Sequence, residues 1–91
     1  MSNNRIRITT VQGLHDYKPE DIKLRVENKR IYIDGRHSAQ GRTSEFHRVF
    51  SLPDDIEPAS VRHRLDLFGE LTIEGLKALP REVDLSFLDD L

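Results

Sequence analysis

One stretch of the sequence organises the fold, Glu45-Phe46-His47-Arg48-Val49-Phe50-Ser51-Leu52-Pro53. Its residues alternate in character and a proline closes it, which is typical of a β-strand. A period of two places Phe46, Arg48, Phe50 and Leu52 on one face and Glu45, His47, Val49 and Ser51 on the other. Because a lone buried charge is very costly, the guanidinium of Arg48 either reaches past the two phenylalanines or pairs with a carboxylate, which a second subunit could supply.

The composition describes one small domain. The chain has 91 residues, of which 36% are hydrophobic and 33% charged, and its net charge is −2, so it has enough apolar residues to fold. Cysteine is absent, which excludes disulfides, thiol catalysis and the usual zinc–cysteine sites. The N-terminal residues lack the apolar segment of a leader peptide, and no apolar run has the length of a membrane span. We therefore expect a cytoplasmic protein, with the nucleus as a further location.

Alternating apolar residues predict a series of short strands, over residues 6–11, 22–27, 30–35, 45–52, 61–67 and 70–75. Asn28-Lys29 is expected to form a tight turn, because asparagine tolerates a positive φ. The polar stretch Ser38–Ser44 is expected to form a short exposed loop, and one helical turn is expected after Pro58. Short strands at regular spacing, without a long helix, predict an all-β antiparallel β-sandwich whose edge strands are open to pairing.

Five segments, taken in order, resemble the α-crystallin domain of small heat-shock proteins: Pro19–Val26, Ile31–His37, Glu45–Arg48, Leu52–Pro58 and Gly69–Ile73. The resemblance covers most of the chain, so residues 1–76 would form the domain and residues 77–91 a C-terminal tail. It implies an immunoglobulin-like β-sandwich. It also implies an ATP-independent chaperone that holds partly unfolded proteins.

The resemblance to the animal branch of that family implies a homodimer, in which the strand with the Phe-His-Arg motif pairs with its twin across a two-fold axis. The interface would then contain Glu45, Phe46, His47, Arg48, Val49 and Phe50. Arg48 would lie at or beside the axis, with Glu45 a candidate for its carboxylate partner. Because Ser38–Ser44 is short, we expect a short dimer strand and no exchange of a long loop between subunits. Few residues precede the first strand, so we do not expect large oligomers.

In the same family, an Ile-x-Ile type motif in the tail docks as an added strand into a groove, and Val83-Asp84-Leu85 is similar to that motif. The groove, which would also receive clients, would be lined by Ile22, Lys23, Leu24, Arg25, Val26, Val61, Arg62, Arg64 and Leu65. Its basic residues would attract the acidic tail. Two alternatives stay open, because Val83, Phe87 and Leu91 also have helical spacing and a short end can be disordered.

Other chemistries find little support in the sequence. Among the four histidines no His-x₃-His spacing occurs, so neither a metal site nor a cofactor is expected, although His37 and His47 lie on neighbouring strands. Asp54 and Asp55 stand in a turn without an apolar pocket, and no phosphate loop or nucleophile elbow is present, so we do not expect an enzyme. The arginines are spread over several strands and matched by acids, so nucleic acid and membrane are not expected as partners.

The leading interpretation is therefore an ATP-independent holdase that works as a dimer or small oligomer and binds partly unfolded proteins. The alternative is an adaptor or co-chaperone docking module, in which the same sandwich binds a folded partner and has no client-holding activity.

Overall fold

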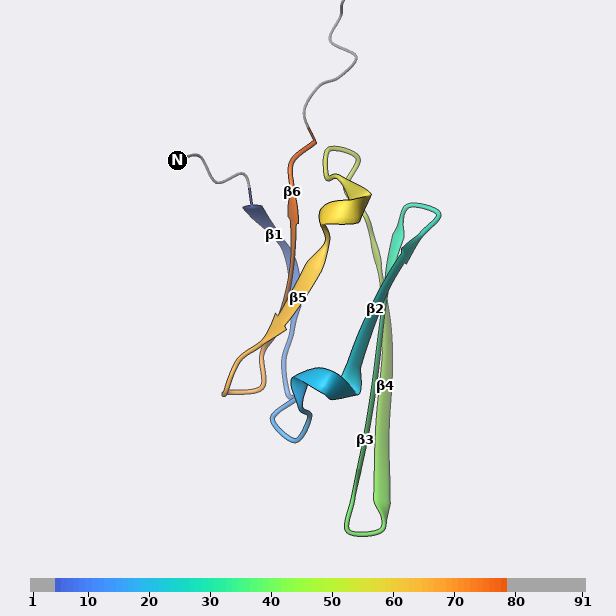
Figure 1. Cartoon of the computed structure of the whole chain (residues 1–91), viewed down its shortest axis with the longest axis vertical. Coiled ribbons are helices and arrows are strands. Elements are labelled where there is room, and N and C mark those ends of the chain that lie inside the picture. The colour runs from blue at the N-terminus through green and yellow to red at the C-terminus, as the bar shows by residue number, and fades with distance from the viewer. Residues whose placement is uncertain (1–4, 79–91) are drawn as a thin grey trace, which may run out of the picture.

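Two three-stranded antiparallel sheets face each other in the computed structural model, which describes residues 5–78 (Figure 1). Sheet A contains, in spatial order, β1 (Arg5–Val11), β6 (Leu71–Leu76) and β5 (Arg62–Leu65). Sheet B contains β2 (Ile22–Glu27), β3 (Arg30–Ala39) and β4 (Arg42–Ser51). Two single-turn 3₁₀-helices, η1 (Pro19–Asp21) and η2 (Pro58–Ser60), precede β2 and β5. The predicted antiparallel β-sandwich is confirmed, and η2 is the helical turn predicted after Pro58.

The hairpin between β2 and β3 forms as the sequence predicts. Asn28 and Lys29 have φ angles of 50° and 64°, and Glu27 pairs with Arg30 on either side of them. Two successive residues with positive φ match the right-handed twist of the flanking strands, which is why such turns are favoured in hairpins. Ile22 is buried, and Leu24 and Val26 are partly buried against the core, as the alternation predicts.

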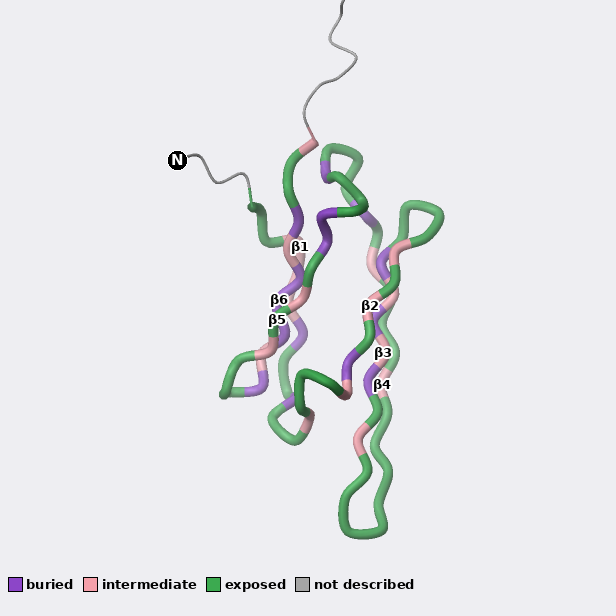
Figure 2. The backbone as a smooth tube through the Cα atoms, in the orientation of Figure 1, coloured by how far each residue is buried: buried purple, intermediate pink, exposed green. Residues whose placement is uncertain are grey.

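The predicted exposed loop at Ser38–Ser44 is wrong, and with it the expectation of a short dimer strand. β3 continues to Ala39, β4 begins at Arg42, and only Gln40 and Gly41 form the turn. Their φ angles of 53° and 77° make this a second hairpin turn with two positive φ angles. This end of the hairpin is exposed (Figure 2), so its strands need no apolar face. Polar cross-strand pairs stabilise it instead, such as Ser38 and Thr43, whose hydroxyl oxygens lie 3.1 Å apart.

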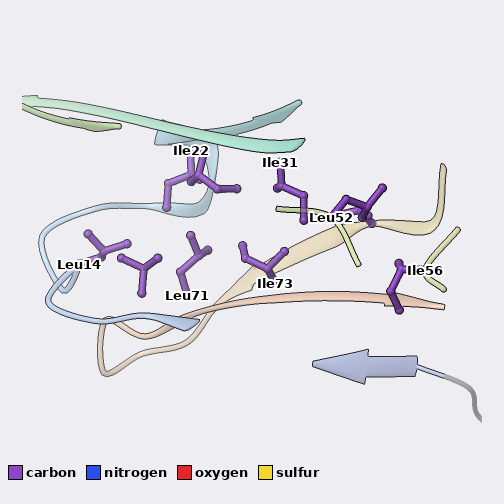
Figure 3. Close-up of a cluster of buried hydrophobic side chains, with 10 residues drawn as sticks. Leu14, Ile22, Ile31, Leu52, Ile56, Leu71 and Ile73 are labelled. Carbon is purple, nitrogen blue, oxygen red and sulfur yellow. The ribbon is translucent and has the colours of Figure 1, made fainter. Parts of the chain in front are cut away.

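The core lies between the central strands of the two sheets (Figure 3). Ile31 and Ile33 of β3 and Leu71 and Ile73 of β6 are completely buried. Each such side chain contributes about 1.5 to 3 kcal/mol of hydrophobic stabilisation. Six further buried residues extend this layer, namely Val11, Leu14, Ile22, Leu52, Ile56 and Val61.

A glycine follows the buried pair on each central strand. A Cβ atom at Gly35 would lie 2.0 Å from the ring of Phe46, and one at Gly75 would lie 2.5 Å from a methyl group of Ile56. The similarity between Ile31-x-Ile33-x-Gly35 and Leu71-x-Ile73-x-Gly75 therefore reflects the same packing in both sheets. Two inward residues fill the core, and the third position is left empty for a neighbouring side chain.

Within residues 5–78 no helix has the length and apolar composition that crossing a membrane requires. The predicted tail motif at Val83 and Leu85 lies outside the described residues.

Candidate functional surfaces

The open edges of the sandwich are β1 and β5 in sheet A and β2 and β4 in sheet B. On β4, Phe46 and Phe50 turn toward the core and are partly buried, while Glu45, His47 and Val49 face outward and are exposed. Val49 is 55% exposed, which is high for a large apolar side chain in a strand. β4 thus carries a ten-residue ladder to β3 on one side, and none of the described strands pairs with its other side.

Arg48 lies on the core side of β4 but is exposed to solvent. Its Nη1 donates a hydrogen bond to the carbonyl oxygen of His47 at 3.0 Å, and its guanidinium lies 5.9 Å from the ring of Phe46. Among residues 5–78 no carboxylate lies within ion-pair distance of Arg48. Of the two outcomes that the sequence allows for this charge within one chain, the structure shows the guanidinium reaching past the rings.

Glu45 and His47 are engaged on the outer face of sheet B. A carboxylate oxygen of Glu45 lies 3.8 Å from Nε of Arg36, and the other lies 3.7 Å from Nε2 of His47. His47 Nδ1 lies 2.7 Å from a carboxylate oxygen of Asp34. The hydrogen bond to Asp34 is the main reason why the pKa of His47 is raised. The pairing of Glu45 with Arg48 of a second subunit stays a prediction.

The predicted groove residues lie on β2 and around β5, the edge strands of the two sheets. Ile22 and Val61 are buried, Leu24, Val26 and Leu65 are partly buried, and Lys23 is exposed. The three arginines among the predicted groove residues have partners close by. Arg25 pairs with Glu27 and lies 4.2 Å from the ring of Tyr32, Arg64 donates to Glu74 at 2.9 Å, and Arg62 donates to the carbonyl oxygen of Val61 at 2.9 Å.

His63 is an inward-facing residue of β5 that the sequence analysis did not select. It lies between Arg62 and Arg64, shares a face with Val61 and Leu65, and is partly buried. Burial disfavours the charged ring and lowers its pKa. The alternation in residues 61–67 contained the signal, because a period of two places His63 on the apolar face.

We predict opposite pH effects for His63 and His47. A lowered folded-state pKa means that protons favour the unfolded chain, so the contribution of His63 to stability is lost as pH falls below about 6.5. A raised pKa means that His47 stabilises the fold below about pH 6.5, and this contribution is lost as pH rises through its folded-state value. Between pH 8 and pH 5, urea unfolding should show a smaller loss of stability for His63→Gln than for the parent, and a larger one for His47→Gln. Curves parallel to that of the parent would contradict both assignments.

The turn between β5 and β6 presents two large apolar side chains to solvent. Leu67 is 96% exposed and Phe68 is 87% exposed. Asp66 fixes the turn, because its Oδ1 accepts hydrogen bonds from the backbone N–H groups of Phe68 and Glu70 at 2.8 and 2.9 Å. The Leu14 N–H donates to the carbonyl oxygen of Gly69 at 2.9 Å and ties the turn to the loop after β1.

The fold requires no apolar residue at either tip position, because Asp66 and Gly69 supply the turn geometry. The strands predicted from the sequence end at residue 67 and resume at residue 70, and the exposed pair was not predicted. The sequence does contain a signal for this pair, because Leu67-Phe68 is an apolar dipeptide at a place where turns usually carry polar residues.

His37 pairs with a carboxylate of η1. His37 Nδ1 lies 2.8 Å from Oδ2 of Asp21, whose pKa is lowered chiefly by the hydrogen bond from the Lys18 N–H. Within the described part of the chain, no three His, Cys, Asp or Glu residues stand close enough together to hold an ion.

Comparison with known proteins identifies this arrangement. The Hsp20/alpha crystallin family profile matches residues 2–85. The chain belongs to this family. It is 30% identical over 89 residues to the alpha-crystallin A chain of Columba livia, covering 92% of this chain and 59% of that protein. It is also 30% identical over 80 residues to the protein lethal(2)essential for life of Drosophila melanogaster, covering 81% of this chain and 43% of that protein. The chain spans about half the length of the curated relatives it matches.

Solved Hsp20/alpha crystallin structures share the fold. The rat alpha crystallin domain superposes with a TM-score of 0.68 at 25% identity, over 87% of this chain and 85% of that one. Stress-induced protein 1 from Caenorhabditis elegans superposes with a TM-score of 0.63 at 26% identity, over 80% of this chain and 77% of that one. The resemblance noted in the sequence is thereby confirmed, as is the α-crystallin type of sandwich. Proteins of this family are generally chaperones rather than enzymes.

Proposed function

We propose that the protein is an ATP-independent holdase that binds partly unfolded proteins as a homodimer. The observation that supports it is apolar surface that the fold does not use: Val49 on an open edge, and Leu67 and Phe68 on a fixed turn. Capture of an unfolding chain requires exposed apolar side chains, and extended segments of such a chain can add to an open strand edge. Membership of the Hsp20/alpha crystallin family supports the same assignment.

β4 is the edge we propose for the dimer. It is ten residues long, as is its neighbour β3, so two copies would form one continuous six-stranded sheet through antiparallel pairing of β4 with β4. Arg48 would then meet a carboxylate of the second subunit, which it lacks in its own described residues. The edges of β2 and β5 stay free in this arrangement and would receive extended segments of clients.

A client aggregation assay tests the holdase. At equimolar ratio the protein should slow aggregation of several thermally destabilised clients. Leu67→Ser/Phe68→Ser should require roughly tenfold more protein for the same protection, because each client contact loses about 1.4 kcal/mol of apolar burial. Gln40→Asn, at the tip of another exposed turn, should protect like the parent, since asparagine tolerates its positive φ. Absence of protection for every client would refute the proposal.

The fixed geometry of the Leu67–Phe68 turn also suits the alternative function, an adaptor or co-chaperone docking module. A rigid apolar anchor loses little entropy on entering a matching pocket of a folded partner. A stable stoichiometric complex with one folded protein, together with no protection of clients, would favour this second function.

The dimer is tested by native mass spectrometry of Arg48→Gly. Removing the guanidinium should leave a carboxylate of the second subunit unpaired and raise the dimer dissociation constant by about tenfold or more. Arg30→Gly, on the outer face of the central strand β3, is the control and should leave the dimer constant unchanged. Identical masses and melting temperatures for the parent and Arg48→Gly would show that the dimer seam lies elsewhere.

A further inference from the structure

The outward-facing sides of the two sheets differ in charge. The outer face of sheet B carries cations and carboxylates in nearly equal number, with Lys23, Arg25, Arg30 and Arg36 against Glu27, Asp34 and Glu45. Most of these charges are matched, since Arg25 pairs with Glu27, and Arg36 lies 3.8 Å from Glu45. Sheet B therefore has the balanced surface expected of a solvated sheet.

The outer face of sheet A has a large excess of positive charge. It carries Arg5 and Arg7 on β1 and Arg62 and Arg64 on β5, and the one carboxylate among these strand positions is Glu74 of β6. Glu74 is shared, since its two oxygens lie 3.6 Å from Arg5 and 2.9 Å from Arg64. We call these four arginines the arginine face.

The other two arginines, Arg7 and Arg62, lie opposite Glu74 on the neighbouring strands, but neither has a carboxylate of residues 5–78 within ion-pair distance. Arg62 Nη1 donates to the backbone carbonyl oxygens of Ala59 and Val61 at 3.0 and 2.9 Å, which are neutral acceptors. Arg7 has no hydrogen bond or ion pair from its side chain among residues 5–78. Four like charges on one small face repel one another, so an anionic occupant would relieve this repulsion.

The C-terminal segment of the same chain has the matching charge. Residues 79–91 hold Glu82, Asp84, Asp89 and Asp90 against a single cation, Arg81. This segment follows β6, the central strand of sheet A, and the last residue of β6, Leu76, pairs with Arg5 at the end of the arginine face. β6 is about 20 Å long, whereas 13 residues can span up to about 43 Å, so the segment is long enough to return along the whole face.

We propose that the acidic segment Glu82–Leu91 lies on the arginine face of its own chain and neutralises it. The attachment at β6 supplies a high effective concentration, so individually weak ion pairs are sufficient. The contact is electrostatic and weakens as salt screens it. This proposal is independent of the holdase function, and it places the carboxylates on β1 and β5 rather than along β2.

Arginine side-chain NMR of the full-length chain tests the contact. The Nε–H resonances of Arg7 and Arg64 should shift when Glu82→Gln, Asp84→Asn, Asp89→Asn and Asp90→Asn are combined, while those of Arg30 and Arg36 on sheet B should not. About 1 M salt, where the Debye length is about 3 Å, should produce the same shifts in the parent. Unmoved Arg7 and Arg64 resonances, or changes confined to Arg25 on β2, would overturn the proposal.

Disulfide trapping gives a second readout, because the chain has no cysteine of its own. Thr10→Cys/Leu88→Cys, with Thr10 on the outer side of β1, should oxidise within one chain roughly tenfold faster than Ser51→Cys/Leu88→Cys, with Ser51 on the outer side of β4. High salt should remove the difference. Equal rates, or products that are cross-linked between two chains, would contradict a contact within the chain.

Discussion

Gly69→Ala is expected to lower the free energy of unfolding by about 2 to 4 kcal/mol. Gly69 has a φ of +85°, a conformation that costs a residue with a Cβ about 1 to 2 kcal/mol. In addition, a Cβ at this position would lie 2.4 Å from the backbone nitrogen of His15. Backbone cannot move aside as a side chain can, so the β5–β6 turn and the loop after β1 would have to separate and would strain the Leu14 to Gly69 hydrogen bond.

Gly13→Ala is the matched control for this prediction. Gly13 has nearly the same φ, +84°, but nothing lies within 4 Å of the position that its Cβ would take. Gly13→Ala should therefore lower the free energy of unfolding only by the cost of the positive φ, about 1 to 2 kcal/mol. Urea unfolding of the parent and both variants gives the difference, which measures the clash with His15 alone. Equal losses would mean that the turn adjusts freely, and the rigid display of Leu67 and Phe68 would then be in doubt.

Ile73→Ala should lower the free energy of unfolding by about 2 to 5 kcal/mol, at least as much as Gly69→Ala. Ile73 is completely buried on the central strand of sheet A and faces the inner side of sheet B. Its truncation removes apolar burial and leaves a cavity that the flanking sheets can close only in part. For a domain of this size such a loss lowers the melting temperature by about 10 °C or more.

Ile6→Ala on β1 provides the comparison for Ile73. Ile6 is 37% exposed at the edge of the same sheet, so its truncation should cost less than about 1.5 kcal/mol. Calorimetric melting of both variants distinguishes the two positions. A similar loss at each would indicate that the edge of sheet A is as well packed as its centre.

Most of the fold could be predicted because one face of each central strand is apolar. Alternation identified the strands at residues 22–27 and 30–35 and their inward faces, and Asn28-Lys29 identified the turn between them. The same rule failed at Ser38–Ser44, where the hairpin extends past the core and its strands carry polar residues on both faces. Periodicity reports burial, so a strand that is not buried gives no signal.

The candidate surfaces were less accessible to sequence reasoning. Alternation placed Arg48 on the phenylalanine face, but its partners depend on distances that no pattern contains. The sequence likewise does not show that Arg64 donates to Glu74 of the neighbouring strand. The exposure of Leu67 and Phe68 was missed for a different reason. Turn propensities describe backbone geometry and do not indicate whether an apolar side chain in the turn is buried or exposed.

The order of the strands has a consequence for the entropy of the chain. Sheet B is closed by two-residue turns, whereas sheet A must join Val11 to Leu71 across about 60 residues. Loop-closure entropy grows with the logarithm of loop length, so this roughly thirtyfold difference amounts to about 3 kcal/mol. The β1–β6 ladder therefore depends most on the side chains packed between the sheets, and the sheet that carries the arginine face is the entropically more costly half of the sandwich.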